Sequence, residues 1–343
     1  MDDLQDRYER LVKEFRAGNR GAALAAEANA LAAASGSTWL RVQARALSAA
    51  ARAADGGELD VEAVVDAILP PIEDAALARL DELLPGPGTL AGRLAAHDAA
   101  TGLPPKAVRS VAEPLIRLLH GRAVEDLALP AEHRLELEFV ELNGSSQLSL
   151  DSSSRPPHLR INANAAWTVE RLVQAISSET YPGRYLASLM RPPSAEWSPS
   201  PQTTVDDGLA MVGREILLAD HELAHELERI RRAVGMSWNG DRIVAVGRAR
   251  DGLAPAYAAA AIASQNEDVR PRLAALGSDP ATAEALVARW SDPLERATSI
   301  ARAAGPPLIR AWLAMVGQTT GLQRLVSERL VPTMLREEMA HAG

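Results

Sequence analysis

The sequence predicts a mainly α-helical protein, with one large helical domain and a small three-stranded β-meander beside a central cleft. Apolar residues recur at helical spacing over most of the 343 residues, whereas strict alternation is confined to one short stretch. Aromatic residues make up only 3% of the chain and alanine dominates the apolar share, so closely packed helices are favoured over a β-sandwich. The length is sufficient to bury a large core.

The N-terminal half, residues 1–128, is predicted to be an array of helices. Leu4, Tyr8, Leu11 and Phe15 fall at helical spacing, and alanine-rich segments follow them. Glycine, proline and aspartate residues interrupt these segments and mark the turns. Helices are expected over about 3–17, 21–34, 38–54, 61–68, 88–100 and 104–122.

The pattern changes in the region 133–162, which is predicted to be the β-meander. In "RLELEFVEL" the side chains of Leu135, Leu137 and Phe139 share one face, as in a half-solvated strand. The segments "QLSLD" and "HLRIN" are the second and third strands. Helices resume in the C-terminal half, 166–343, within the same single domain. Helix breaks are expected at 182, near 200, and at 236–241, 278–281 and 304–307.

Composition excludes several classes of function. The net charge of −9 argues against a nucleic-acid partner. The absence of cysteine excludes disulfides, thiolate metal sites and a cysteine nucleophile. The chain start lacks the apolar core of a signal peptide, and no window approaches the roughly 18 apolar residues of a membrane span, so we expect a cytoplasmic protein without a membrane partner. Lys13 and Lys106 are the only lysines, and this arginine bias is typical of a high-GC bacterium.

Three segments of the C-terminal half follow one another as in a metal-binding motif, but the histidines of that motif are missing. The stretch "SETYPGRY" (178–185) is followed by "VDDGLAMVGREILL" (205–218), and "DPLERATSIARAAGPPLIRAWL" comes later. This order resembles the bacterial family known as domain of unknown function 885, a group assigned as zinc metallopeptidases with a largely helical, gluzincin-like fold. The family hallmark is His-Glu-x-Tyr-Pro-Gly-His-His, followed by a helix that opens with Glu-Gly. The resemblance runs from about residue 75 to 337.

The resemblance implies a position for each part of a zinc site. It implies two histidine ligands where this chain has Ser178 and Arg184. It implies a glutamate ligand where the chain has the shorter Asp207, and a general base that survives as Glu179. A tyrosine of the last core helices corresponds to Arg302.

These substitutions predict a site without a metal cofactor. Ser178 is a poor zinc ligand, and the guanidinium of Arg184 has no lone pair to offer. Glu179 and Asp207 would then face each other without a cation, which raises the pKa of at least one. We expect Arg184 to pair with both carboxylates and replace the neutralising role of the ion. The alternative is that Arg184 points to solvent and pairs with nothing.

The candidate site residues fall into two groups, each with a structural alternative. Glu179 and Tyr181 are the candidate catalytic residues, and the alternative for Glu179 is a relic held for structure. The tyrosine rings fit hydrogen bonding to a ligand or, more commonly, core packing. The candidate residues for binding a substrate or ligand are Ser178, Arg184, Tyr185, Asp207 and Arg302.

A second motif, His221-Glu222-Leu223-Ala224-His225, competes with the first. On a helix its histidines share one face and could grip zinc with Glu222 as the base. Glu267 is the best candidate for a third ligand. The alternative is a solvated helix face with charge pairs four residues apart.

The sequence therefore leaves two hypotheses for the function of the protein and one alternative. The chain is expected to be a degenerate, metal-free, metallopeptidase-like protein, but whether it is an enzyme stays open. It either performs non-peptidase acid–base chemistry on a small anionic ligand, for example in secondary metabolism, or acts as a partner subunit or homo-oligomer. The alternative is a zinc metallopeptidase that uses His221 and His225.

Overall fold

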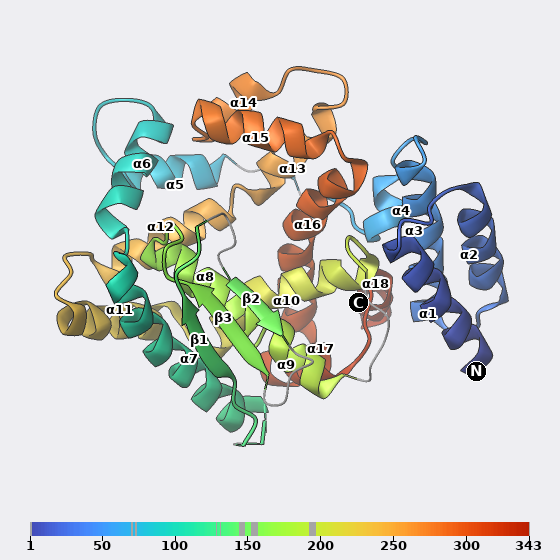
Figure 1. Cartoon of the computed structure of the whole chain (residues 1–343), viewed down its shortest axis with the longest axis horizontal. Helices are drawn as coiled ribbons and strands as arrows, with labels where there is room; N and C mark the ends of the chain where they lie inside the picture. Colours follow the sequence, from blue (N-terminus) through green and yellow to red (C-terminus); the bar gives the residue numbers. More distant parts are fainter. Residues whose placement is uncertain are drawn as a thin grey trace.

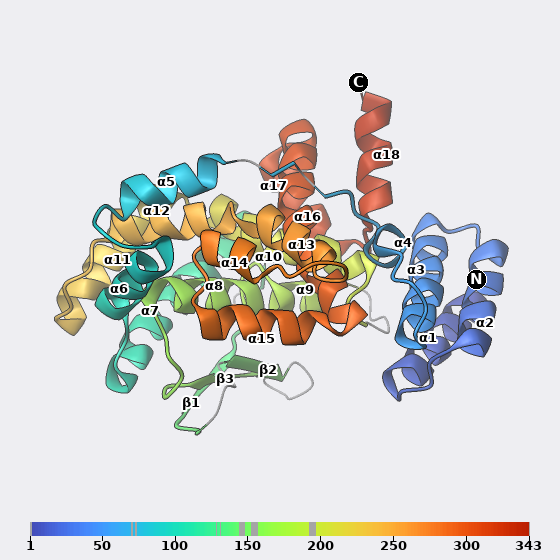
Figure 2. The same ribbon diagram turned by 90° about the horizontal axis from the view of Figure 1, so that it is seen from above.

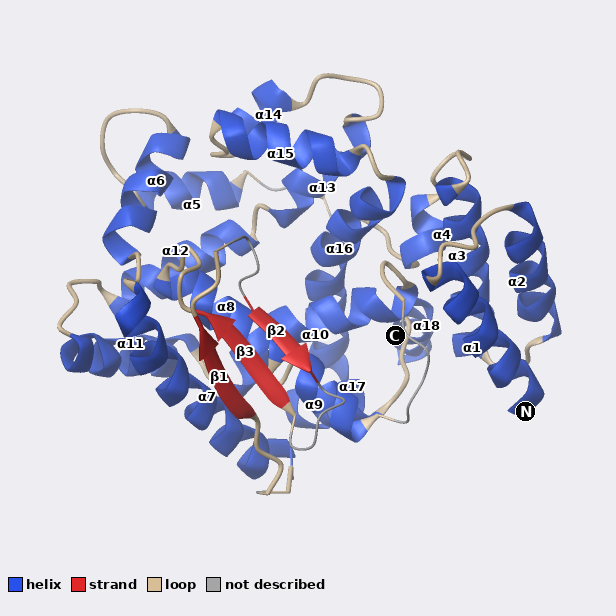
Figure 3. Ribbon diagram, in the orientation of Figure 1, coloured by secondary structure: helices blue, strands red, loops and turns tan. Residues whose placement is uncertain are grey.

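The computed structural model describes all residues except 1, 70, 73, 128, 131, 144–147, 152–156, 192–196 and 343. It confirms a mainly α-helical fold with one small three-stranded sheet, and the sheet lies on one side of the helical body (Figures 1–3). The C-terminal helix projects from the other side (Figure 2). None of the described helices is long and apolar enough to cross a membrane.

Four N-terminal helices form one end of the molecule (Figure 1). Side chains that cap helix starts set two of their boundaries, because Ser37 accepts from the amide of Leu40 and Asp60 from that of Ala63. Their small alanine side chains pack closely with one another and with a long C-terminal helix. The four helices are α1 (Asp2–Arg16), α2 (Ala22–Ala34), α3 (Thr38–Ala54) and α4 (Val61–Val65).

Three further helices complete the N-terminal half, and the second and third of them lie close to the predicted ranges 88–100 and 104–122. Thr89 caps the second of them through the amide of Gly92. The third carries Pro114 inside the helix and continues to the start of the sheet region. These helices are α5 (Ala75–Leu83), α6 (Leu90–Thr101) and α7 (Pro105–Leu127).

The sheet contains the three predicted strands, β1 (Glu136–Val140), β2 (Leu148–Asp151) and β3 (His158–Asn162). The order is β1-β3-β2, so the last strand is central. It pairs with β1 in parallel and with β2 antiparallel, and the connectivity is therefore not that of a simple meander. Alternation explains this arrangement only in part, because it fixes which side chains face the core but not which strands are neighbours. The sequence "NGSS" (143–146) predicts a turn between the first two strands, and from residue 144 on this turn lies outside the described residues.

The C-terminal half is helical throughout, and most predicted breaks separate helices. The breaks at 182, near 200, at 236–241 and at 278–281 each fall between two helices. The helices are α8 (Val169–Glu179), α9 (Arg184–Met190), α10 (Pro201–Leu217), α11 (Asp220–Val234), α12 (Gly240–Asp251), α13 (Ala254–Ala263), α14 (Arg270–Ala275), α15 (Pro280–Trp290), α16 (Pro293–Val316), α17 (Gln318–Ser327) and α18 (Pro332–Ala342).

The predicted break at 304–307 is wrong, because α16 runs without interruption through Pro306 and Pro307. A proline in a helix interior removes a hydrogen bond and usually kinks or ends the helix. Here the surrounding core outweighs that cost, since Gly305 and Pro306 are buried in the body of the protein. Tertiary packing of α16 therefore overrides the local preference of the sequence.

Candidate functional site

The predicted motif forms a tight turn between α8 and α9. Glu179 is the last residue of α8, and Arg184 is the first residue of α9. Gly183 is required between them, because a Cβ atom there would lie 1.9 Å from the carbonyl oxygen of Ser178. The turn also rests on α10, where a Cβ atom on Gly213 would lie 2.4 Å from the ring of Pro182. The sequence thus brings Glu179 and Arg184 to the same side of one turn.

A close helix crossing brings the other two charged residues to this place. Helices α10 and α16 touch at Gly208 and Gly305, and a Cβ atom on Gly208 would lie 2.8 Å from the backbone of Gly305. Asp207 precedes the first glycine, and Arg302 lies about one turn before the second. Asp207 and Arg302 are therefore close to each other because the two glycines let the helices cross closely.

Glu179, Arg184, Asp207 and Arg302 together form what we call the charged constellation. Arg184 Nη1 lies 3.2 Å from Glu179 Oε2, and Arg302 Nε lies 3.8 Å from Asp207 Oδ2. The two carboxylate side chains are only 22% and 27% exposed, whereas those of Arg184 and Arg302 are 67% and 57% exposed. Each sheltered carboxylate thus has an arginine on its outer side.

The pKa of Asp207 reflects this arrangement. Burial raises it to about 6, the neighbouring charges of Asp206 and Glu179 add to the rise, and Arg302 and Arg184 oppose it. Arg184 therefore acts electrostatically on both carboxylates but contacts only Glu179. The prediction that Arg184 pairs with both acids is therefore wrong for Asp207, whose contact is with Arg302.

The two tyrosines of the motif lie in the core and not in the constellation. Tyr181 is fully buried, and its hydroxyl donates to the carbonyl oxygen of His133 at 3.0 Å. Its ring meets the rings of Tyr185 and His120 edge to face, at centroid distances of 5.5 and 5.3 Å. Burial raises the pKa of Tyr181. The geometry gives both tyrosines a packing role, and it places Tyr181 outside the group of candidate catalytic residues.

The donor set of the motif does not fit a zinc ion. The hydroxyl of Ser178 accepts a hydrogen bond from Gln174 Nε2 at 3.1 Å, and a guanidinium occupies the second implied ligand position. Zinc requires about three nitrogen, sulfur or oxygen ligands with lone pairs to share. Across the described part of the chain, no group of three or more histidine, aspartate and glutamate side chains is arranged to hold a metal ion.

The competing motif lies on the surface of α11. His221 and His225 are exposed, whereas Glu222 pairs with Arg122 and accepts from the backbone amide of Ala219 at 3.0 Å. That amide contact caps the start of α11, so Glu222 has a structural partner on each side. The structure does not bring the proposed third ligand to these histidines. Glu267 is exposed, 3.8 Å from Arg272, just before α14, which lies apart from α11 in both views (Figures 1 and 2).

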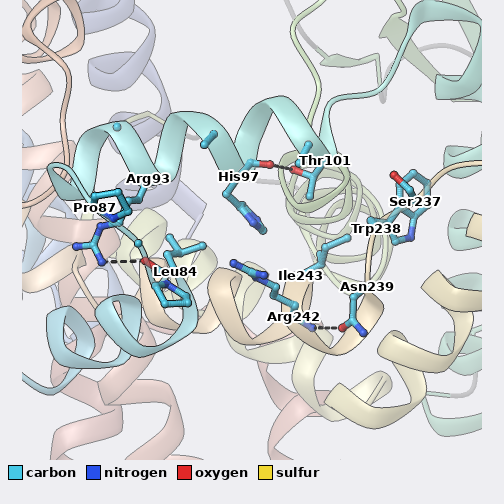
Figure 4. A pocket seen from close by; sticks show the side chains of 15 residues that line it. Leu84, Pro87, Arg93, His97, Thr101, Ser237, Trp238, Asn239, Arg242 and Ile243 are labelled. Atoms are coloured by element: carbon cyan, nitrogen blue, oxygen red, sulfur yellow. Dashed lines mark hydrogen bonds between the residues drawn. The ribbon is translucent and has the colours of Figure 1, made fainter.

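A hollow of about 490 Å³ lies between α6 and the start of α12 (Figure 4). Most of its polar groups serve the backbone. Arg93 donates to the carbonyl of Leu84 at 2.8 Å, and Asn239 caps α12 through the amide of Arg242. His97 points into the space between the two helices (Figure 4), and its Nε2 lies 3.6 Å from a carboxylate oxygen of Glu170.

A larger cavity of about 700 Å³ borders the charged constellation through Arg302, which belongs to both. Arg214 and Asp251 also line it, and sequence reasoning did not single out either residue. The only signal for Arg214 is a lone arginine inside the apolar run "MVGREILL", which has many structural explanations. Asp251 stands before a glycine at the end of α12 and looks like an ordinary helix end.

Comparison with known proteins adds nothing to this geometry, because no family model, no curated protein and no solved structure matches the chain. The resemblance to the metallopeptidase family therefore rests on the motif residues alone.

Proposed function

We propose that the charged constellation is the functional site of a metal-free protein that binds a small anionic ligand. In this proposal the site is a degenerate, metallopeptidase-like one, in which Arg184 stands at a ligand position and the chemistry is not zinc hydrolysis. The two exposed guanidinium groups would hold the ligand, and the sheltered carboxylates beneath them would orient it.

One observation carries the proposal: two arginines from different helices are more than half exposed, yet each is anchored by a single carboxylate. A guanidinium has five N–H donors, and one carboxylate at 3.2 or 3.8 Å leaves most of them free. An anion with several oxygens can therefore accept from both arginines at once, and such charge-assisted bonds are the stronger ones.

Acid–base chemistry is the second step of the proposal. Glu179 lies beside Arg184, so it would stand next to a ligand bound there and could exchange a proton with it. Asp207 is an additional candidate, because its pKa of about 6 lets it hold or release a proton near neutral pH.

Large exposed apolar side chains give the partner-subunit reading no specific support. In the described part of the chain two of them, Ile68 and Ile72, share the loop before α5, and the others lie on three further segments, as Leu142, Ile262 and Met315. A docking surface would need a contiguous patch.

Sulfate is a suitable probe, because its charge is constant between pH 5.5 and 7.5. Equilibrium dialysis of labelled sulfate should show saturable binding that Arg184→Gln and Arg302→Gln each weaken by about tenfold, as expected for a charged hydrogen bond. Arg229→Gln is the matched control, since Arg229 is 58% exposed and also paired with one carboxylate. Binding should strengthen at pH 5.5, because a protonated Asp207 no longer competes for Arg302. Equal sulfate binding in all four proteins would refute the proposal.

A further inference from the structure

The cavity of about 700 Å³ is lined by residues of α6, α8, α10, α11, α12 and α16 and of the loop before α15. Its size is in the range of small-molecule sites. Part of the wall is apolar and comes from Leu223, Leu227, Val244 and Leu253. The remainder is charged, and the pairing of those charges decides what the cavity can bind.

Most arginines of the wall are already paired. Arg248 is held by both carboxylate oxygens of Asp220, at 2.9 and 2.7 Å. Arg250 donates to Asp98 at 2.7 Å and to Glu170 at 3.1 Å. The remaining two, which are half exposed, also have acidic neighbours, Arg171 with Asp98 and Arg302 with Asp207.

Arg214 is the exception among these cations. Its side chain is only 7% exposed, and its Nε and Nη1 atoms have no hydrogen-bond partner among the described residues. The nearest carboxylate oxygen, of Asp220, is 3.9 Å from Nη1, which is too long for a hydrogen bond. Two buried donors without an acceptor are costly, so this end of the cavity needs an anion or water.

Asp251 is the corresponding exception among the carboxylates. Asp279 caps α15, Asp98 holds two arginines, and Glu170 holds Arg250. The carboxylate of Asp251 has no ion pair within 4.0 Å in the described structure, although Arg214, Arg248 and Arg310 act on it from a greater distance. Among the described residues, the same space thus holds a guanidinium with one long ion pair and no hydrogen bond at two of its nitrogens, and a carboxylate without an ion pair.

We propose that this cavity binds a free α-amino acid with an apolar side chain. The carboxylate of the ligand pairs with the guanidinium of Arg214, which lines the cavity, and its ammonium group donates to Asp251. Arg214 and Asp251 act on each other electrostatically but lie more than 4.0 Å apart, so a ligand with both charges can contact each of them. The side chain lies against the leucines and Val244, where burial of apolar surface adds affinity.

This site is separate from the charged constellation in its binding groups, although Arg302 lies at the edge of both. A zwitterion satisfies both unpaired groups and leaves the net charge of the cavity unchanged. A simple anion would satisfy Arg214 but would add a negative charge beside Asp251. The complementarity therefore favours the zwitterion over the sulfate-like ligand of the constellation.

The test uses calorimetric titration of the full chain at pH 7.5 with L-leucine and L-phenylalanine. Each is compared with its N-acetyl derivative, which lacks the ammonium group, and with its amide, which lacks the carboxylate. We expect at least one free amino acid to bind saturably and both of its derivatives to bind at least tenfold more weakly. These ligand comparisons use the unmodified protein, so they do not depend on any variant that fails to fold.

Variants then assign the binding groups. Asp251→Asn should weaken the free amino acid at least tenfold and leave its N-acetyl derivative unchanged, and Arg214→Lys should weaken the acetylated form as well. Arg184→Gln should not alter amino-acid binding, which separates this result from the sulfate test. No binding of either amino acid up to about 10 mM, equal binding of the free and derivatised forms, or loss of binding in Arg184→Gln would overturn the inference.

Discussion

The ionised carboxylate of Asp207 should destabilise the fold at neutral pH, and Asp207→Asn measures by how much. Its pKa is about 6 in the folded protein, compared with 3.8 for an ordinary aspartate. Each tenfold change in proton affinity corresponds to about 1.4 kcal/mol, so the full difference amounts to about 3 kcal/mol. The side chain is 27% exposed, and water reduces this cost, so we expect about 2 kcal/mol.

The sign follows from proton linkage. Below pH 3.8 the carboxyl group is neutral in both states and contributes nothing. Between pH 3.8 and about 6 the unfolded chain gives up its proton first, so the free energy of unfolding falls as the pH rises. Above pH 6 the loss is complete and constant. The asparagine variant does not titrate, so its advantage over the original protein should grow through this interval and then level off.

The measurement is urea unfolding of both proteins from pH 4 to pH 8. The measured quantity is the free energy of unfolding of Asp207→Asn minus that of the original protein. This difference should be about 2 kcal/mol larger at pH 8 than at pH 4. The lost contact with Arg302 contributes little, because that arginine is 57% exposed. Asp126→Asn, which changes an exposed residue at the end of α7, is the control and should differ by less than about 0.5 kcal/mol at either pH. A difference independent of pH, or one that favours the original protein at pH 8, would refute the reasoning.

Two further substitutions test the local geometry by urea unfolding. Gly208→Ala should destabilise the protein by about 1–3 kcal/mol, because the new methyl group would lie 2.7 Å from Ile309 Cγ1; the control Gly121→Ala, in open space on α7, should be neutral or stabilise by up to about 1 kcal/mol. Equal effects at both glycines would contradict the close crossing. Tyr181→Phe should cost about 1–2 kcal/mol, since the hydrogen bond from the buried Tyr181 to the carbonyl of His133 is lost, and should leave sulfate binding unchanged. A fall in sulfate binding with unchanged stability would return Tyr181 to the functional site.

The sequence predicts most helices of the fold, because the signals that begin and end these helices lie within the helices or next to them. Capping residues such as Ser37 and Asp60 and the alanine-rich segments fix helix positions close to the predicted ones. The failures come from interactions between distant segments. The alternation of the strands does not predict that β3 is central in the sheet. The proline pair 306–307 predicts a break in α16, and burial in the core keeps that helix continuous.

The candidate site was predictable in proportion to how local each contact is. Glu179 and Arg184 flank one turn, so their proximity follows from five residues of sequence. The pairing of Asp207 with Arg302 depends on a crossing of two helices nearly a hundred residues apart in sequence, and the family resemblance named both residues without suggesting that they pair. Burial of a polar side chain is a property of the whole fold, so Arg214, with its unpaired donors, could not be recognised from its neighbours.

Helix α10 connects the two sites physically. Asp207 and Arg214 are seven residues apart, so they lie on the same face of the helix and about 10 Å apart along it. One end of this face meets Arg302 at the constellation, and the other end lines the cavity. Helix α10 packs closely against α16 at Gly208 and against Pro182 at Gly213. Both contacts lie between Asp207 and Arg214, so the segment that joins the two charged residues is fixed in place. If both proposed ligands bind, we expect one to act on the other through charge, which salt and pH can modulate, because close packing at Gly208 and Gly213 opposes movement of the helix.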